Sequence, residues 1–183
     1  MLALALVGLL LGIAIVNFGA FGGGRALEEA TWRLETALRM ARAEAANQGR
    51  RLRIAFGEED GRFYVLWEPD PLAAPGKFAE YAACTWDDYV SMDGVVVERC
   101  ELVGPSYYQA MDASSPAGAL PSGTASGLAA VTFEPDGSSD SAVIELSATD
   151  AADSRRAVIE LEGLTGTVTS RILSPEELEG SHP

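Results

Sequence analysis

Hydrophobic and polar positions divide the chain into an uncharged segment, an amphipathic segment and an alternating segment. From Met1 to Gly24 no residue is charged, and the apolar side chains lie all round a helix rather than along one face. At about 1.5 Å per residue this segment makes a helix of roughly 36 Å, enough for a hydrocarbon core of about 30 Å. We expect a transmembrane helix over residues 1–24, with its apolar contacts made by Leu2, Leu4, Leu6, Leu9, Leu10, Ile13 and Ile15.

A secretory signal peptide, cleaved among the small residues of 19–24, is the alternative for this segment. No Lys or Arg precedes the apolar run, and the run is longer than the roughly 7–15 residues of a signal-peptide core. Both features favour a retained helix. The orientation in the membrane is not defined, because Arg25 is the only nearby cation.

Residues 25–46 form the amphipathic segment, in which apolar residues recur at steps of three or four. Glu29 with Arg33 and Glu35 with Arg39 are oppositely charged i,i+4 pairs on its polar face. The spacing predicts a helix with one buried stripe, made by Leu27, Ala30, Leu34, Leu38, Ala41 and Ala45.

Gly49 is placed to end this helix, because glycine readily takes the left-handed conformation of a C-terminal cap. No proline separates the apolar and amphipathic segments, so we expect one continuous helix. Its weak point is the set of glycines at 19 and 22–24, each costing up to about 1 kcal/mol relative to Ala. We expect a bend or a frayed turn there.

Residues 51–172 have the alternation and turn signals of β-strands. Leu52, Ile54 and Phe56 alternate with other residues, and a second alternation over 63–67 follows a glycine-containing turn. This predicts a hairpin whose apolar side covers the helix stripe. Further strands are expected over 95–103 and, as a four-stranded meander, over 129–134, 142–147, 155–161 and 167–172.

Residues 69–94 and 104–127 are rich in turn-forming residues and are expected to be long loops. The predicted fold class is therefore α+β, with a long N-terminal helix packed on antiparallel strands around one core. We expect a transmembrane segment over 1–24 and a domain over 25–174, made of a helix over 25–46 and a β-rich part over 51–172. A solvated, frayed acidic tail is expected over 175–183.

Net charge argues against nucleic acid as a partner. The chain has 13 basic and 27 acidic residues, a net charge of −14. Residues 1–56 have a net charge of +3 and residues 57–183 a net charge of −17. Because non-specific nucleic-acid affinity comes mainly from cations that neutralise phosphates, DNA or RNA binding is not expected. Peripheral docking on anionic lipid is disfavoured for the same reason.

Common catalytic and metal-binding motifs are absent from the sequence. The single histidine is the penultimate residue, His182, and there is no nucleophile elbow, phosphate-binding loop or zinc spacing. We therefore expect no enzyme activity, no cofactor and no metal. Cys84 and Cys100 could form a disulfide worth about 3 kcal/mol in an oxidising compartment, and two buried thiols are the alternative.

Two acidic clusters are the remaining candidates for chemistry. Asp136, Ser138 and Asp140 near Glu134 have the alternation of a calcium loop but lack a later glutamate at the spacing of an EF-hand, and a polar hairpin turn explains them fully. The pair at 87–88, followed by a tyrosine, fits a solvated edge or a partner contact better than a catalytic carboxylate pair.

Three passages resemble the GspH/FimT-like family of type IV pilins and pseudopilins. One contains Leu34, Leu38, Ala41-Arg42, Glu44-Ala45 and Gly49-Arg50. The others are Val131-x-Phe133-x-Pro135-Asp136-Gly137-Ser138 and, further on, Arg155-Arg156-Ala157-Val158 with Leu164-Thr165-Gly166-x-Val168. Their order and spacing, together with the apolar helix, extend the resemblance over most of the chain apart from the two loops.

The resemblance implies a minor pseudopilin of a type II secretion system. Such a protein is a single-pass inner-membrane subunit with a periplasmic β-sandwich, placed near the tip of a short pseudopilus that drives protein export. Its expected partners are other pseudopilins, the inner membrane and exported proteins. Family precursors carry a leader ending in Gly; aligning Gly8 with the helix glycine of the family puts the usual acidic residue upstream of Met1. We therefore expect a truncated or mis-started N-terminus. A genuine start at Met1 would compromise processing by a prepilin peptidase and normal subunit docking.

Two other functions are consistent with parts of the sequence. A FimT-like minor pilin of a type IV pilus or DNA-uptake machine would share the fold, but Arg171 is followed by Glu176, Glu177 and Glu179 rather than by basic residues. Tight DNA binding in a low-salt gel shift would favour that alternative. A membrane-anchored enzyme or sensor would instead need a polar-lined pocket within 69–127.

Overall fold

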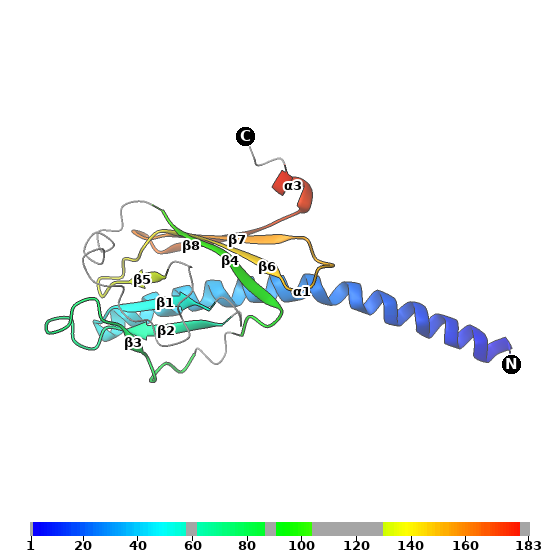
Figure 1. Ribbon diagram of the computed structural model, residues 1–183, viewed down its shortest axis with the longest axis horizontal. Coiled ribbons are helices and arrows are strands. Elements are labelled where there is room, and N and C mark those ends of the chain that lie inside the picture. Colours follow the sequence, from blue (N-terminus) through cyan, green and yellow to red (C-terminus); the bar gives the residue numbers. More distant parts are fainter. Residues whose placement is uncertain (1, 58–61, 87–90, 104–129, 180–183) are drawn as a thin grey trace.

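The computed structural model describes residues 2–57, 62–86, 91–103 and 130–179, with side chains from Arg25 onward. It forms two four-stranded antiparallel sheets, β3-β2-β1-β5 (sheet A) and β4-β6-β7-β8 (sheet B), against a long helix (Figure 1). The elements are α1 Leu2–Gln48, β1 Leu52–Phe56, β2 Phe63–Trp67, β3 Ala79–Glu80, β4 Val95–Leu102, β5 Val131–Phe133, β6 Ala142–Ala148, β7 Arg156–Glu162, β8 Thr167–Leu173 and α3 Pro175–Glu179. The predicted α+β fold is confirmed.

Helix α1 joins the two predicted helical segments without interruption. The stripe predicted from the spacing is buried throughout, with Leu27, Leu34 and Ala41 fully inaccessible. Gly49 has φ 62° and ends the helix as expected, with the Arg50 N–H donating to the Ala45 carbonyl at 3.1 Å. The frayed turn expected at glycines 19 and 22–24 is not found, because the helix is assigned continuously through them.

Sheet A is built on the predicted hairpin. β1 pairs with β2 in the register Ile54↔Val65, and the Gly57 N–H donates to the Arg62 carbonyl at 2.8 Å to close the turn. Leu52, Ile54 and Phe56 are buried in the core shared with α1. The apolar side of the hairpin therefore covers the helix stripe, as the sequence predicts.

The predicted four-stranded meander is wrong in one strand. β6, β7 and β8 form consecutive antiparallel pairs in sheet B, but β5 pairs with β1 in sheet A. The alternation of residues 131–133 fixes which side chains face the core and does not fix which strand they pair with. The β5–β6 turn therefore crosses from sheet A to sheet B.

The start of the tail is helical rather than frayed. Ser174, Pro175 and Glu177 have the pattern of a capping box with proline at the first helical position. Both the N–H and the hydroxyl of Ser174 donate to the Glu177 carboxylate, at 2.8 and 3.0 Å. These hydrogen bonds lower the pKa of Glu177. Where the predicted loop over 69–94 is described, at 69–86 and 91–94, its one regular element is the two-residue strand β3. The loop over 104–127 lies outside the described residues.

Candidate assembly site

The predicted membrane and assembly residues lie in the part of α1 that projects from the domain. Leu2, Leu4, Leu6, Leu9, Leu10, Ile13 and Ile15 are all within α1, and their side chains are outside the described set. Figure 1 shows this half of the helix extending away from both sheets. Among the described residues, no helix has the length and apolarity of a membrane span.

Arg42 attaches the other half of α1 to two turns of the β-region. Its Nε donates a hydrogen bond to the carbonyl of Gly137 in the β5–β6 turn. A Cβ on Gly166, in the β7–β8 turn, would overlap the Arg42 guanidinium, and Gly166 has φ 67°. The guanidinium therefore lies directly against this glycine. The three passages that carry the family resemblance meet at this one side chain.

The two turns that contact Arg42 also pack backbone against backbone. The Ser139 N–H donates to the Gly163 carbonyl, and the Gly163 N–H donates to the Ser141 hydroxyl, both at 2.9 Å. A Cβ on Gly163 would overlap the Ser139 carbonyl oxygen and lie 2.9 Å from the Asp140 carbonyl carbon. Only glycine allows this approach. Helix, sheet A and sheet B are thus held together at one point, which we call the Arg42 junction (Arg42, Gly137, Gly163 and Gly166).

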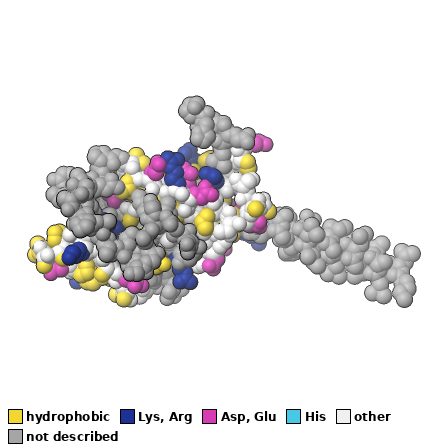
Figure 2. Space-filling model, viewed as in Figure 1, with side chains coloured by type: hydrophobic (Ala, Val, Ile, Leu, Met, Phe, Trp, Pro, Cys, Tyr) yellow, Lys and Arg dark blue, Asp and Glu magenta, His cyan; other side chains and the backbone are white. Residues whose placement is uncertain are grey.

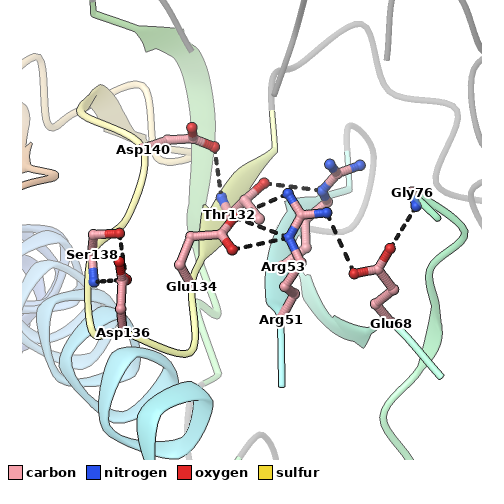
Figure 3. Close-up of polar contacts among 9 residues, drawn as sticks. All are labelled: Arg51, Arg53, Glu68, Gly76, Thr132, Glu134, Asp136, Ser138 and Asp140. Atoms are coloured by element: carbon pink, nitrogen blue, oxygen red, sulfur yellow. Dashed lines mark hydrogen bonds and ion pairs between the residues drawn. The ribbon is translucent and has the colours of Figure 1, made fainter. Parts of the chain in front are cut away.

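A partly buried ionic network lies on the face of sheet A opposite the core (Figure 3). Continuing the strand registers places Arg51 between Glu68 and Glu134. The Arg51 guanidinium donates to Glu134 at 3.0 Å and to Glu68 at 3.4 Å. Glu68 also accepts a hydrogen bond from the Gly76 N–H. Burial raises the pKa of Glu134, and the hydrogen bonds and charge of Arg51 oppose that rise.

The calcium candidate is a hairpin turn whose carboxylates bind protein donors. Asp136 accepts hydrogen bonds from the N–H and hydroxyl of Ser138, which lower the pKa of Asp136. Asp140 accepts from the Thr132 N–H at 2.9 Å, and Glu134 pairs with Arg51. The three carboxylates therefore bind different partners, as Figure 3 shows. Within the described part of the chain, no group of three or more His, Cys, Asp or Glu is placed to hold a metal.

The remaining candidates include the cysteines and one acidic pair. The structure has Cys84 and Cys100 as thiols rather than as a disulfide, with Cys84 half-buried and Cys100 buried in β4. Burial raises the pKa of Cys100 to about 12. The acidic pair at 87–88 and His182 lie outside the described residues, as do residues 87–90 and 104–127 of the region in which a ligand pocket was considered.

We predict that the two thiols react at very different rates. At pH 8 a buried thiol with a pKa of about 12 is almost wholly protonated, and only the thiolate is nucleophilic. In the folded chain an alkylating reagent should modify Cys84 first and Cys100 only after unfolding. Peptide mass spectrometry checks this order. Failure of both residues to react in unfolded, unreduced protein would instead establish the disulfide.

The outer face of sheet B carries side chains of both signs. Arg156 pairs with Glu98 at 3.0 Å, and Arg171 pairs with Glu160 at 2.9 Å. Figure 2 shows Lys or Arg and Asp or Glu side chains together on this upper part of the molecule. Because these charges neutralise one another across strands, the face is suited to water. The pairing of Arg171 also weakens its value as a phosphate contact.

Sequence reasoning missed two features of this region. Glu68 was not singled out, although it directly follows a predicted strand and so lies opposite Arg51 once the hairpin register is known. Gly163 was not singled out because its role depends on a turn more than 20 residues away in the chain, as its contacts with Ser139 and Ser141 show. The hairpin register could have revealed Glu68; nothing in the local sequence identifies Gly163.

Comparisons with known proteins agree with this geometry. Two solved structures of the minor pseudopilin EpsH from the type II secretion system of Vibrio cholerae are similar to the structure of this chain. One is 14% identical with a TM-score of 0.51, covering 82% of this chain and 95% of that chain. The other is 13% identical with a TM-score of 0.49, covering 82% and 98%. No curated protein sequence matches significantly. The family model for the type II transport protein GspH matches residues 30–165.

The similarity to the first of these structures supports the fold, a long helix held on two antiparallel sheets. The family match covers the Arg42 junction and most of both sheets. The chain belongs to the GspH family of type II transport proteins, and it is a minor pseudopilin of a type II secretion system. Pseudopilins are structural proteins that assemble with one another.

Proposed function

We propose that this subunit is held in the inner membrane by residues 1–24 of α1 and assembles through that helix near the tip of the pseudopilus. Its globular domain then lies in the periplasm and supports protein export across the outer membrane. The observation that carries the proposal is the division of α1 into a projecting half and a half fixed by both sheets.

The sequence of the projecting half supports a role in lipid and in helix packing. Residues 2–24 contain no charged side chain, so burial of this segment carries no penalty for desolvating a charge. The domain has no comparable need for a membrane, because its own apolar stripe on α1 is already covered by the sheets. The uncharged segment therefore needs a different apolar environment.

Structural features of the domain support secretion rather than DNA uptake. Arg171 is paired with Glu160, and the following helix α3 carries three glutamates. Nucleic-acid binding requires cations available to phosphates. We therefore propose other pseudopilins, and exported proteins, as the partners of this chain, and no nucleic acid.

The proposal is tested by placing a charge in the projecting helix. A carboxylate near the middle of a bilayer costs about 2.5–3.5 kcal/mol on insertion scales. Leu6→Asp or Leu9→Asp is therefore expected to abolish membrane retention and protein export together, while Leu6→Ile leaves both near wild type. Membrane fractionation and the amount of exported protein are the measurements. Normal export by either aspartate variant would contradict the proposal.

A further inference from the structure

The two described sheets end in four edge strands, and three of them are protected against pairing with another chain. In sheet A the edges are β3 and β5, which have only two and three residues. In sheet B one edge is β4, whose pairing with β6 is interrupted by a register shift between Val97 and Arg99. β4 also carries the charged residues Glu98, Arg99 and Glu101. Short strands, bulges and charges are the means by which proteins keep an open edge from pairing.

β8, the other edge of sheet B, lacks this protection. Its seven residues, from Thr167 to Leu173, pair with β7 without a register shift. Its sequence is Thr-Val-Thr-Ser-Arg-Ile-Leu, and its single charged residue, Arg171, is already paired with Glu160 of β7. Most of these residues are β-branched, which favours the extended conformation. Among the described strands, β8 is therefore the one best suited to accept a further strand.

The open edge of β8 is centred on Ser170. Val168 is buried, whereas Thr169 and Ser170 are exposed. Arg39 of α1 donates to the Val168 carbonyl at 3.3 Å, so this carbonyl points away from β7. In an antiparallel ladder the backbone groups that point away from the paired strand recur at every second residue. The N–H and C=O groups of Ser170 and Ile172 therefore lie along the same edge.

β8 runs lengthwise along the part of α1 that carries the domain, as Figure 1 shows. One end of the strand follows the turn that lies against Arg42. At the other end Leu173 pairs with Arg156. The adjacent Arg155 contacts Glu28 of α1 at 3.4 Å, so this end is level with the start of the domain's half of the helix. A strand added to this edge would therefore lie along the helix axis rather than across it.

This direction excludes a second copy of the chain as the added strand. Two identical edges that pair antiparallel are related by a two-fold axis perpendicular to the strands. Because β8 lies along α1, that axis would point the two projecting helix halves in opposite directions. Two chains anchored in one membrane cannot adopt that arrangement, and the restriction also applies to any anchored subunit of this fold that offers the equivalent edge. A protein that is being exported is not held in this membrane and is free of the restriction.

The charges at the α3 end of β8 define the chemistry of the added segment. The arginines at this end are all paired, namely Arg155 with Asp153, Arg156 with Glu98 and Arg171 with Glu160. By contrast, Glu176 is exposed, and helix α3 carries two more glutamates and no cation. Thr169 and Ser170 at the centre of the edge are uncharged. A segment with an uncharged centre and a Lys or Arg level with α3 would complement both parts.

We infer that the β8 edge binds an extended segment of an exported protein as an added strand. The inference rests on the proposed function, in which the anchored subunit supports export. In strand addition the backbone groups supply the affinity, and the side chains on alternate residues supply the specificity. The segment therefore needs an uncharged centre and a basic end, and it does not need one particular sequence.

Site-specific photo-cross-linking in cells with a working secretion system tests this contact. Full-length chains carry Thr169→p-benzoylphenylalanine on β8, and Glu101→p-benzoylphenylalanine, on the protected edge strand β4, is the matched control. We expect position 169 to give an adduct with a protein whose release into the medium depends on the same secretion system, and position 101 to give none. Adducts only with another pseudopilin or a second copy, or none at all, would overturn the inference.

Substitutions of Ser170 separate strand addition from an ordinary side-chain contact. Ser170→Pro removes one N–H from the edge and Ser170→Ala keeps it, so only the proline variant should lower the yield of the Thr169 adduct several-fold. Ser170→Lys should lower the yield as well, because a lysine on an edge strand opposes pairing. The thermal unfolding of the lysine variant should match wild type, since Ser170 is exposed. An unchanged yield with Ser170→Lys would refute strand addition.

The basic end of the segment is tested in the same cells. Glu176→Lys is expected to lower the yield of the Thr169 adduct several-fold, because like charges placed opposite one another repel. Glu176→Asp keeps the charge and should preserve the yield. An unchanged yield with Glu176→Lys would refute a basic residue level with α3.

A measurement of export distinguishes this inference from the proposed function. Ser170→Lys should reduce export several-fold and leave membrane retention at the wild-type level, because the uncharged segment 1–24 is unchanged. Leu6→Asp should lose both. Normal export by Ser170→Lys, combined with loss of export in Leu6→Asp, would refute strand addition and leave the membrane-anchored subunit intact.

Discussion

Gly163→Ala is expected to lower the free energy of unfolding by about 4 kcal/mol. Overpacking accounts for about 3 kcal/mol of this loss, and a lost hydrogen bond accounts for about 1 kcal/mol. The added methyl would overlap the Ser139 carbonyl oxygen, and it would lie 2.9 Å from the Ser141 nitrogen. Those atoms belong to a backbone that is hydrogen-bonded to Gly163 itself. Relief therefore requires the two turns to separate, which would also release the contact of Arg42 with Gly137.

Gly49→Ala is the matched control for this substitution. Gly49 has φ 62° and no atom within 4 Å of an added Cβ, so the change introduces backbone strain without overlap. That strain is about 1–2 kcal/mol. Chemical denaturation of full-length protein in detergent, followed by circular dichroism, compares the two. Equal destabilisation would show that the close approach at Gly163 does not contribute.

Arg51→Met is expected to lower the free energy of unfolding by about 3 kcal/mol at pH 7, because it leaves carboxylates without their cation in a low-dielectric site. The side chains of Glu68 and Glu134 are only 1% and 11% exposed. Arg171→Met is the control, since the Arg171–Glu160 pair is 62% and 51% exposed and such pairs contribute about 1 kcal/mol or less. The difference between these two variants measures the effect of burial.

The effect of Arg51→Met should shrink as the pH falls. Burial already raises the pKa of Glu134 in the folded chain, and Arg51 opposes that rise. Between the ordinary and the raised pKa the folded state binds the additional proton, so protonation stabilises the fold as the pH decreases. Without Arg51 the pKa rises further, so the variant recovers more stability than wild type between pH 7 and about pH 5. A difference that stays constant with pH would contradict this account.

Local periodicity predicted the elements well because it reports burial directly. The stripe from Leu27 to Ala45 is buried at every predicted position, and the alternation of β1 faces the core as expected. Pairing between distant strands leaves no such local signal. The three residues of β5 could therefore be recognised as a strand but not assigned to sheet A, where they pair with Ile54, Arg53 and Leu52.

The sequence predicts the candidate assembly helix because its N-terminal run of residues without charge is visible there. The passages that resemble the family include Arg42, Gly137 and Gly166, but the sequence gives no physical reason for these residues. The fold supplies that reason, because the guanidinium of Arg42 lies where the turns from both sheets meet.

The unbroken course of α1 has a mechanical consequence. A helix of 47 residues spans about 70 Å, and its far end is clamped to both sheets at Arg42. Because the helix is continuous from Leu2 to Gln48, a displacement of its N-terminal half would be transmitted along the helix axis to both sheets. The projecting half and the globular domain would then move together as one rigid unit.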